Sequence, residues 1–570
     1  MSNSILITLG HNSSVIFFNG KSKPIGYEEE RLNQVKSCSA FPQLSLNKII
    51  EEVGENAIIN STVYVSHWFD NFDLKTTKNK YFDCDKFLDF TRQYDLKVVS
   101  LNKDFTHHDA HAYSGRAFLK YNNDFVFPSK GFHYIVADGF GNNQEVLSVY
   151  HQRGSVASEP TLVARLYGYK NSIGLMYQFA TSYCGMKENQ DEYKFLGYES
   201  NIKKALKNPE KQIHIIKEKA VTFANDIVLS LTSEITKKSK TLDLIDLHDL
   251  QVARDFYRDV FNSVLVATDC EIEHIRTVIV YFIQQVVENV LAILIDWYEI
   301  ENIVLSGGCF YNVKLNNKVL KTVEGLVSVI PLAGDQGCAI GLYDKYNNEK
   351  QTFNFSDLCF GNRKIKYTDL EKNVPQVIFS SNRESFESTV SLLINDNCIV
   401  NVLSGEMEFG PRALCNTSTL ALPTQENVDY INHLNGRNTV MPMAPVMLEK
   451  NISMFRDQKS LSRVIGSNEY MIMTHDFALH YQFDINYKGV THKYPTHDVY
   501  SGRPQIIKEA DKRPIRRILE NVKSQCLINT SFNTHGTPIL YSVENCIEDF
   551  KKQRVLDYEN RTYLIILTNE

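Results

Sequence analysis

The sequence predicts an α/β protein with more than one domain. Its 570 residues exceed what one ordinary hydrophobic core holds, so two domains are expected. Short apolar runs at 132–137, 302–305 and 327–332 each lead into glycine and polar residues before the next helical stretch. Strands that alternate with helices in this way are typical of α/β folds.

Composition excludes several other classes. Hydrophobic residues make up 43% of the chain and charged residues 22%, as in globular proteins. The net charge of −6 gives no overall field that would recruit nucleic acid or a membrane surface. The eleven cysteines include no C-x-x-C pair, which favours free thiols in a reducing compartment.

We therefore expect a cytoplasmic protein without a membrane segment. The N-terminus has no basic stretch followed by an apolar one, and polar residues interrupt the long apolar run at 277–298. That run is interpreted as a helix that faces the core. Whether the chain forms a homo-oligomer stays open.

The first β-hairpin is expected near the N-terminus. Apolar residues at 5–9 and 15–18 flank a polar turn that contains His11. His11 is either a site residue or a plain turn residue. A charged connection at 27–36 is then expected to lead into a helix from about residue 44 to residue 53.

The stretch 106–114 holds three histidines and no hydrophobic stripe. If it is helical, His107 and His111 lie one turn apart on one face, the spacing of helical metal-binding pairs. His108 would point elsewhere. The alternatives are an exposed polar helix start, or core imidazoles satisfied by hydrogen bonds.

Two carboxylates follow predicted strands. Asp138 and Asp335 each stand at a strand end beside glycine, a common place for site residues in open α/β sheets. Asp138 taken alone could instead be a residue that caps a turn. A third strand runs into Ser306, Gly307 and Gly308, with Asn312 beyond, and this order is a weak signature of phosphate or nucleotide binding.

The chain changes character after a polar linker predicted at 344–355. Three arginines then stand beside glycine or proline in loops, a setting suited to bidentate capture of phosphate or carboxylate. Any one of them is also explained by pairing with a surface acid. The candidates in this half are Arg412, Arg437 and Arg503, with Asn529, Ser531 and Asn533 further on.

The ordered set of motifs resembles a known family. It comprises His11, the 107–111 block, Asp138-Gly, Glu192-x-Lys194-x-x-Gly197, Ser306-Gly-Gly, Gly334-Asp335-x-Gly337, Met407-Glu-Phe-Gly-Pro-Arg-Ala-Leu414 and Asn529-Thr-Ser-Phe-Asn533-x-x-Gly536-x-Pro538-Ile539. This order is similar to that of the O-carbamoyltransferases of nodulation-factor, aminoglycoside and cephem biosynthesis. The resemblance covers nearly the whole chain, except a helical region around 200–280.

The resemblance implies two domains. Residues 1–350 would form an actin/Hsp70-like duplicated domain, similar to the universal tRNA threonylcarbamoyl transferase, that transfers a carbamoyl group to a hydroxyl with a divalent metal. Residues 351–570 would form a smaller α/β domain, similar to threonylcarbamoyl-adenylate synthase. That domain would make carbamoyl adenylate from carbamoyl phosphate and ATP, with Mg²⁺ accompanying the ATP.

The resemblance also assigns roles to residues. The metal, Fe²⁺ first and Mn²⁺ second, would be held by His107, His111, Asp138 and Asp335. The catalytic candidates are His11, which would orient or deprotonate the acceptor hydroxyl, and Lys194, which would contact nucleotide or phosphate. Nucleotide contacts would come from Gly307, Gly308 and Asn312. The anions of the C-terminal domain would be held by Arg412, Arg437, Arg503, Asn529, Ser531 and Asn533.

The sequence departs from the family pattern mainly in the C-terminal domain. Asn435 stands where the family has the lysine of its Lys-x-Arg pattern, and Glu406 replaces an arginine. Two alternatives therefore remain open beside an O-carbamoyltransferase with a small-molecule acceptor. One is the same chemistry on a hydroxymethylated base in a nucleotide or in DNA, and the other is a non-catalytic nucleotide-binding partner with a decayed activating site.

Overall fold

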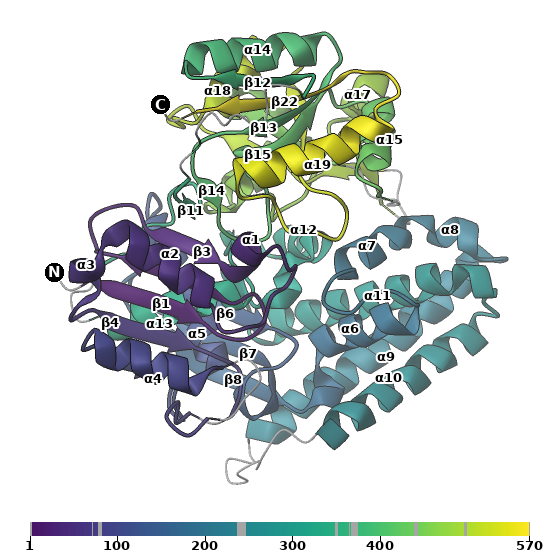
Figure 1. Cartoon of the computed structure of the whole chain (residues 1–570). Coiled ribbons are helices and arrows are strands. Elements are labelled where there is room, and N and C mark those ends of the chain that lie inside the picture. The colour runs from purple at the N-terminus through teal and green to yellow at the C-terminus, as the bar shows by residue number, and fades with distance from the viewer. Residues whose placement is uncertain are drawn as a thin grey trace.

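The computed structural model describes residues 3–70, 72–77, 82–235, 247–347, 351–363, 365, 374–437, 443–494 and 499–568. Figure 1 shows three groups of strands, each covered by helices. Two five-stranded sheets lie within residues 4–329, and a seven-stranded sheet lies within residues 377–567.

The first sheet has the order β3-β2-β1-β4-β5. Its strands are β1 (Ser4–Thr8), β2 (Ser14–Phe18), β3 (Ile25–Glu28), β4 (Thr62–Ser66) and β5 (Lys97–Ser100). The first three form an antiparallel meander, which confirms the predicted hairpin around His11. The last two run parallel to β1 and to each other. The charged connection leads into α2 (Gln43–Val53), close to the helix expected there.

The second sheet repeats this pattern. Its strands are β6 (Phe132–Ala137), β7 (Glu145–Gln152), β8 (Thr161–Tyr167), β9 (Ile303–Ser306) and β10 (Val327–Val329), in the order β8-β7-β6-β9-β10. Again three strands, β6 to β8, form an antiparallel meander. On the other side of β6, β9 pairs parallel with β6 and β10 pairs parallel with β9. This repeated order confirms the duplicated actin-like fold.

A helical region separates β8 from β9. It contains α6 (Ile173–Tyr183), α7 (Glu192–Gly197), α8 (Ile202–Ala205), α9 (Pro209–Ile235), α10 (Leu247–Ala267) and α11 (Ile275–Trp297). The segment Ile272–Trp297 is long and apolar enough to cross a membrane, but 72% of its most apolar window is buried inside the protein. It packs against α9 as a core helix, as expected from its polar interruptions.

Two helices pack between the five-stranded sheets. Helix α5 (His107–Tyr121) precedes the second sheet and lies on β6 and β9, whereas α13 (Cys338–Tyr346) follows that sheet and lies on β1 and β4 of the first. Each half therefore places its last helix on the sheet of the other half. At their crossing, a Cβ added to Gly341 would lie only 1.8 Å from the carbonyl oxygen of Ala110.

The polar stretch after α13 differs from the linker expected at 344–355. Helix α13 itself extends to Tyr346, and Phe353 and Phe355 are 1% and 0% exposed. Their rings pack on each other and, through Phe353, on Phe18 of β2. The two phenylalanines therefore anchor this stretch to the core of the first sheet.

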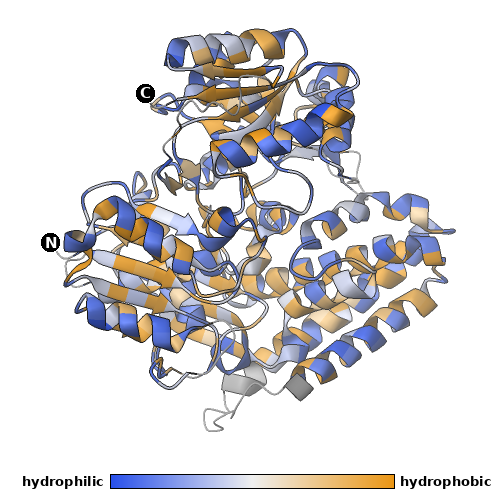
Figure 2. Cartoon of the chain, in the orientation of Figure 1, coloured by the Kyte–Doolittle hydropathy of each residue, from blue (hydrophilic) through white to orange (hydrophobic). Residues whose placement is uncertain are grey.

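The seven-stranded sheet forms the C-terminal unit. Its order is β12 (Val377–Ser380), β22 (Thr562–Leu567), β13 (Ile399–Leu403), β15 (Thr417–Ala421), β21 (Cys526–Ser531), β16 (Ala444–Leu448) and β20 (Gln505–Ile507). Helices α14 (Arg383–Asn395) and α18 (Pro514–Asn521) pack together on it, and α15 (Gln425–Leu434) packs with α19 (Val543–Leu556). The strands are mainly apolar while the helices mix polar and apolar residues (Figure 2).

The crossing of α5 and α13 yields a stability prediction. We expect Gly341→Ala to lower the free energy of unfolding by roughly 1–3 kcal/mol, because the new methyl group overlaps backbone that cannot rotate away. Urea unfolding followed by circular dichroism measures the change. Gly139→Ala is the matched control, since a Cβ at that position meets no atom within 4 Å. Equal stability of the two variants would contradict the prediction.

Candidate functional site

Helix α5 begins with the histidine block and holds it in the interior. The carboxylate of Asp109 accepts a hydrogen bond from the Thr106 N–H (2.8 Å), which fixes the first turn of the helix. His107 is 1% exposed and His111 is 0% exposed, so the alternative of an exposed polar helix start is wrong. Their Nε2 atoms lie 3.2 Å apart, as the one-turn spacing requires.

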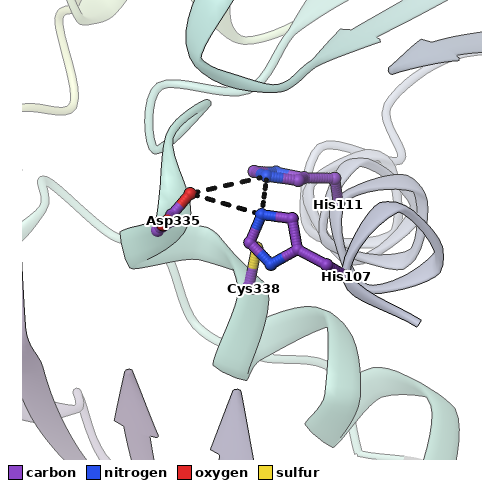
Figure 3. A group of neighbouring side chains, drawn as sticks. All are labelled: His107, His111, Asp335 and Cys338. Carbon is purple, nitrogen blue, oxygen red and sulfur yellow. Dashed lines mark hydrogen bonds and ion pairs between the residues drawn. The ribbon is translucent and has the colours of Figure 1, made fainter. Parts of the chain in front are cut away.

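Two carboxylates from the second half of the duplicated domain face these imidazoles. Asp138 Oδ2 lies 3.4 Å from His107 Nε2 and 3.2 Å from His111 Nε2. Asp335 Oδ1 lies 3.4 Å and 3.8 Å from the same two atoms (Figure 3). The Gly139 N–H donates to Asp138 Oδ1 (2.8 Å), which leaves Oδ2 turned toward the histidines. The structure thus brings together all four residues proposed as metal ligands.

The electrostatics of this cluster fit a cation. Burial disfavours the charged form of His107, but Asp335 and Asp138 outweigh burial and raise its pKa to about 10. Burial likewise opposes ionisation of Asp138, and hydrogen bonds to both histidines nevertheless hold its pKa well below the usual range. Two imidazole nitrogens and two carboxylates converging in the interior suit a six-coordinate ion such as Fe²⁺ or Mn²⁺.

His108 points away from the cluster, as predicted. Its Nδ1 lies 2.8 Å from Ser148 Oγ, and Ser148 in turn accepts a hydrogen bond from Arg165 Nε (3.0 Å). Arg165 is itself paired with Glu145 and Asp109. Burial and the nearby Arg165 lower the pKa of His108 well below its usual value. His108 is therefore a neutral member of a buried polar network that supports the N-terminal turn of α5.

The hairpin turn with His11 follows a strand that ends beside this centre. Thr8 Oγ1, at the end of β1, lies 3.5 Å from the carbonyl oxygen of Asp335. Nε2 of His11 is buried and has no hydrogen-bond partner among the described residues. A nitrogen left free in this way is available to a ligand, and the catalytic role of His11 stays a prediction.

The glycine turn after β9 packs tightly on the end of β6, next to Asp138. A Cβ at Gly307 would lie 2.2 Å from the carbonyl oxygen of Ala137, and one at Gly308 would lie 2.8 Å from Asp138 Oδ1. Asn312 caps α12 (Val313–Thr322) through its Oδ1 and donates to Gln284 through its Nδ2. Both polar groups of Asn312 thus already serve the fold, and its nucleotide contact stays a prediction.

A second cluster contains the three predicted arginines. Arg412 and Arg503 repel each other, and both interact with Tyr193 of α7. Arg437 also interacts with Tyr193. Burial lowers the pKa of each of these guanidinium groups. Within the described residues no salt bridge pairs any of the three with a carboxylate, and Nε of Arg412 is buried without a partner. Asp549 lies near Arg437 but forms no salt bridge with it. Desolvated guanidinium groups without a paired carboxylate fit an anionic ligand.

Hydrogen bonds shape one wall of this cluster. Arg437 donates to Thr530 Oγ1 (2.9 Å) and to Asn533 Oδ1 (2.8 Å), and Ser531 Oγ donates to the same Asn533 oxygen (2.6 Å). Asn529 instead donates to Gln505 (2.7 Å) and to the carbonyl oxygen of Ala413 (3.0 Å), next to Arg412. Asn529 therefore positions the loop, whereas Arg437, Ser531 and Asn533 form one connected group.

Lys194 connects the two units. It lies on α7 of the N-terminal domain, where it pairs with Asp191, and its Nζ is 2.8 Å from Nε2 of His535 in the C-terminal unit. Lys194 thus faces the arginine cluster, and no contact joins it to the histidine and carboxylate cluster in the described residues. Its proposed contact with nucleotide or phosphate fits this place and stays a prediction.

A buried ion network also joins the two units. Arg31 Nη2 donates to the carbonyl oxygen of Gly410 (2.5 Å), and the Gly410 N–H donates to Glu28 Oε2 (3.0 Å). Arg31 pairs with Glu28 and Glu30, and Glu28 also hydrogen-bonds with Gln336, the neighbour of Asp335. The charged connection predicted at 27–36 is therefore partly interior. It fixes the loop that carries Arg412 beside the histidine and carboxylate cluster.

Sequence reasoning missed four contributors: Arg31, Tyr193, Cys338 and His535. Tyr193 and His535 have no distinctive spacing, and only the packing of the two units brings them to the arginines. Arg31 sits in a charged run that looks solvated in the sequence. The spacing could have identified Cys338 from the sequence, because it stands three residues after Asp335 and so lies on the same helical face.

The chain is similar in sequence to known protein families and to individual relatives. Residues 50–342 match the carbamoyltransferase N-terminus and residues 391–563 match the carbamoyltransferase C-terminus. The uncharacterized protein MJ1051 of Methanocaldococcus jannaschii is 28% identical over 571 residues, covering 95% of each chain. Nodulation protein NolO of Bradyrhizobium diazoefficiens is 28% identical over 262 residues, which is 43% of this chain and 46% of NolO.

Solved structures give weaker similarity. Full-length HypF in the phosphate- and nucleotide-bound form is 13% identical, with a TM-score of 0.29 over 60% of this chain and 54% of HypF. Sua5 of P. abyssi, complexed with L-threonine, is 12% identical, with a TM-score of 0.23 over 34% of this chain and 50% of Sua5. The fold assignment therefore rests on the order and direction of the strands.

The two sequence matches follow one another along the chain, and the first alone covers more than half of it. The first contains the histidine and carboxylate cluster, and the second contains the arginine cluster. The chain belongs to the carbamoyltransferase family and is a carbamoyltransferase enzyme.

Proposed function

We propose that the chain is an ATP-dependent O-carbamoyltransferase that works in two steps. The C-terminal domain would hydrolyse carbamoyl phosphate with one water to carbamate and phosphate. The carbamate oxygen would then attack the α-phosphate of ATP, forming carbamoyl adenylate and releasing pyrophosphate. The N-terminal domain would transfer the carbamoyl group to an acceptor hydroxyl and release AMP. Membership of the family makes the chain an enzyme, so a non-catalytic binding partner is no longer an alternative.

The observation that carries this proposal is the pair of unlike sites joined by one buried connection. The arginine cluster offers desolvated guanidinium groups that no salt bridge pairs with a carboxylate in the described residues, which suits triphosphate and carbamoyl phosphate. The histidine and carboxylate cluster offers ligands for a divalent cation. The Glu28–Arg31 network holds the Arg412 loop against the histidine and carboxylate cluster, so an adenylate made at the arginine cluster has a short path to it.

The first step depends on the arginines. Guanidinium groups of Arg412, Arg437 and Arg503 would bind the phosphate oxygens and stabilise the negative charge that grows as pyrophosphate departs. Their desolvation before the substrate arrives strengthens this effect, because charges interact more strongly where water is excluded. Mg²⁺ would accompany ATP. Arg437 is held in place by Thr530 and Asn533, so little reorganisation is needed on binding.

The second step depends on the histidine and carboxylate cluster. His107, His111, Asp138 and Asp335 would hold Fe²⁺, with Mn²⁺ as the second choice. A bound divalent ion supplies Lewis acidity toward phosphate and carbonyl oxygens. Nε2 of His11, which is buried and has no hydrogen-bond partner among the described residues, would accept the proton of the acceptor hydroxyl as it attacks the carbamoyl carbon.

The two-site arrangement predicts that the half-reactions separate by mutation. We expect His107→Ala, and independently Asp335→Asn, to reduce carbamoyl transfer at least about a hundredfold, because each removes one metal ligand. Carbamoyl-adenylate formation, followed as carbamoyl-phosphate-dependent ATP–pyrophosphate exchange, should persist. His133→Ala, on a half-exposed histidine of β6 that stacks on His151, is the control. Loss of both half-reactions together in folded His107→Ala protein would contradict the two-site proposal.

The arginine cluster gives the converse prediction. Arg412→Ala should lower ATP–pyrophosphate exchange about a hundredfold or more, since it removes a preorganised donor to the developing charge. Binding of the divalent metal, measured by calorimetry on the metal-free protein, should stay unchanged. Arg516→Ala removes an arginine that pairs with Glu520 on the outer helix α18 and serves as the control. Exchange at the normal rate in Arg412→Ala would overturn the assignment.

The acceptor is to be found by direct assay. The chain would be incubated with ATP, carbamoyl phosphate and, in separate reactions, hydroxylated sugars, nucleotides and DNA with hydroxymethylated bases. A mass increase of one carbamoyl group on an acceptor would identify its class. No carbamoylated product from any of these classes, combined with no pyrophosphate exchange, would contradict the proposed activity as a whole.

A further inference from the structure

A cysteine lies among the groups of the proposed metal centre. Sγ of Cys338, a ring nitrogen of His107, a ring nitrogen of His111 and a carboxylate oxygen of Asp335 all lie within 4.8 Å of one another. Figure 3 shows the sulfur beside the ring of His107. Metal–ligand bonds of about 2.0–2.3 Å separate opposite ligands of one ion by about 4–4.6 Å. The spread of these four atoms is therefore close to that of ligands around a single ion.

The backbone explains why the four groups converge. Asp335 opens a 3-10 turn that continues into α13 at Cys338, so the two residues are three apart on one helical face. His107 and His111 are four apart on one face of α5. The close crossing of the two helices at Gly341 sets these two pairs against each other. Each helix thus offers two ligand atoms to the same point.

Cys338 is also free to bind. Its side chain is 0% exposed, and no hydrogen bond engages its Sγ in the part of the chain that the structure describes. Asp138 approaches the same two imidazoles from the end of β6. The ligand set available to one ion is therefore two imidazoles, two carboxylates and one sulfur.

We propose that Cys338 is a ligand of the metal and that its sulfur makes the centre prefer thiophilic cations. The inference rests on the proposed metal centre and adds a residue and a selectivity to it. As the metal–sulfur bond forms, the thiol gives its proton to solvent, and no electron transfer is involved. Sulfur ligands favour Fe²⁺, Co²⁺ and Zn²⁺ over Mn²⁺ and Mg²⁺, which prefer oxygen.

Cobalt spectroscopy tests the assignment without relying on activity. Metal-free full-length protein would be titrated with Co²⁺, and we expect one bound ion with a sulfur-to-cobalt charge-transfer band in the near ultraviolet. Cys338→Ser should lose the band, keep the weaker visible cobalt absorption, and bind Co²⁺ more than about tenfold more weakly. Its affinity for Mn²⁺ should change less than about threefold.

The matched control is Cys309→Ser, because Cys309 lies near Asp138 on the turn after β9. We expect this variant to keep the band. Loss of the band in Cys309→Ser with retention in Cys338→Ser would overturn the assignment, as would its absence in the wild type.

A measurement on the wild type alone keeps the test valid if Cys338→Ser fails to fold. X-ray absorption of the zinc-loaded protein should show one sulfur at about 2.3 Å from the metal, and only nitrogen and oxygen neighbours would contradict the inference. One bound Co²⁺ ion without sulfur ligation overturns the role of Cys338 and leaves the metal centre standing. No bound Co²⁺ at all contradicts the metal centre itself.

Discussion

The contact between Gly341 and Ala110 is the constraint on which the N-terminal site depends. There is no room at that crossing for even one methyl group, so α5 and α13 approach backbone to backbone. The N-terminal ends of both helices consequently meet, and they carry His107 and His111 on one side and Asp335 and Cys338 on the other. A larger residue at position 341 would separate two pairs of proposed ligands that the sequence places more than 200 residues apart.

A second constraint acts between the domains. Glu28 and Arg31 contact both the N–H and the carbonyl oxygen of Gly410, so this backbone unit is held from both sides in the interior. Breaking one partner of such a buried pair is costly, because it leaves an uncompensated charge. The loop that carries Arg412 is therefore tied to the N-terminal domain, and the two sites keep a fixed relation.

Local patterns predicted much of this structure. The four-residue spacing predicted the shared face of His107 and His111, and the strand pattern placed the carboxylates of Asp138 and Asp335 at strand ends. The family resemblance supplied the duplicated fold and the roles of the residues. Contacts that depend on tertiary packing were out of reach, such as Tyr193 among the arginines and His535 beside Lys194. Burial of the run at Glu28–Arg31 also went unrecognised, because its charges are compensated by pairing within the run and by tertiary contacts with Gly410 and Ser45.

The exchange of helices between the two halves of the duplicated domain has a consequence for metal binding. One pair of the proposed ligands belongs to the helix that ends the first half, and the other proposed ligands belong to the second half, so neither half alone offers a complete set. Occupancy of the centre and closure of the halves are therefore thermodynamically linked. A cation bound there would act as a cross-link, and it would oppose any opening between the two sheets by a free energy that grows with the logarithm of its concentration divided by its dissociation constant.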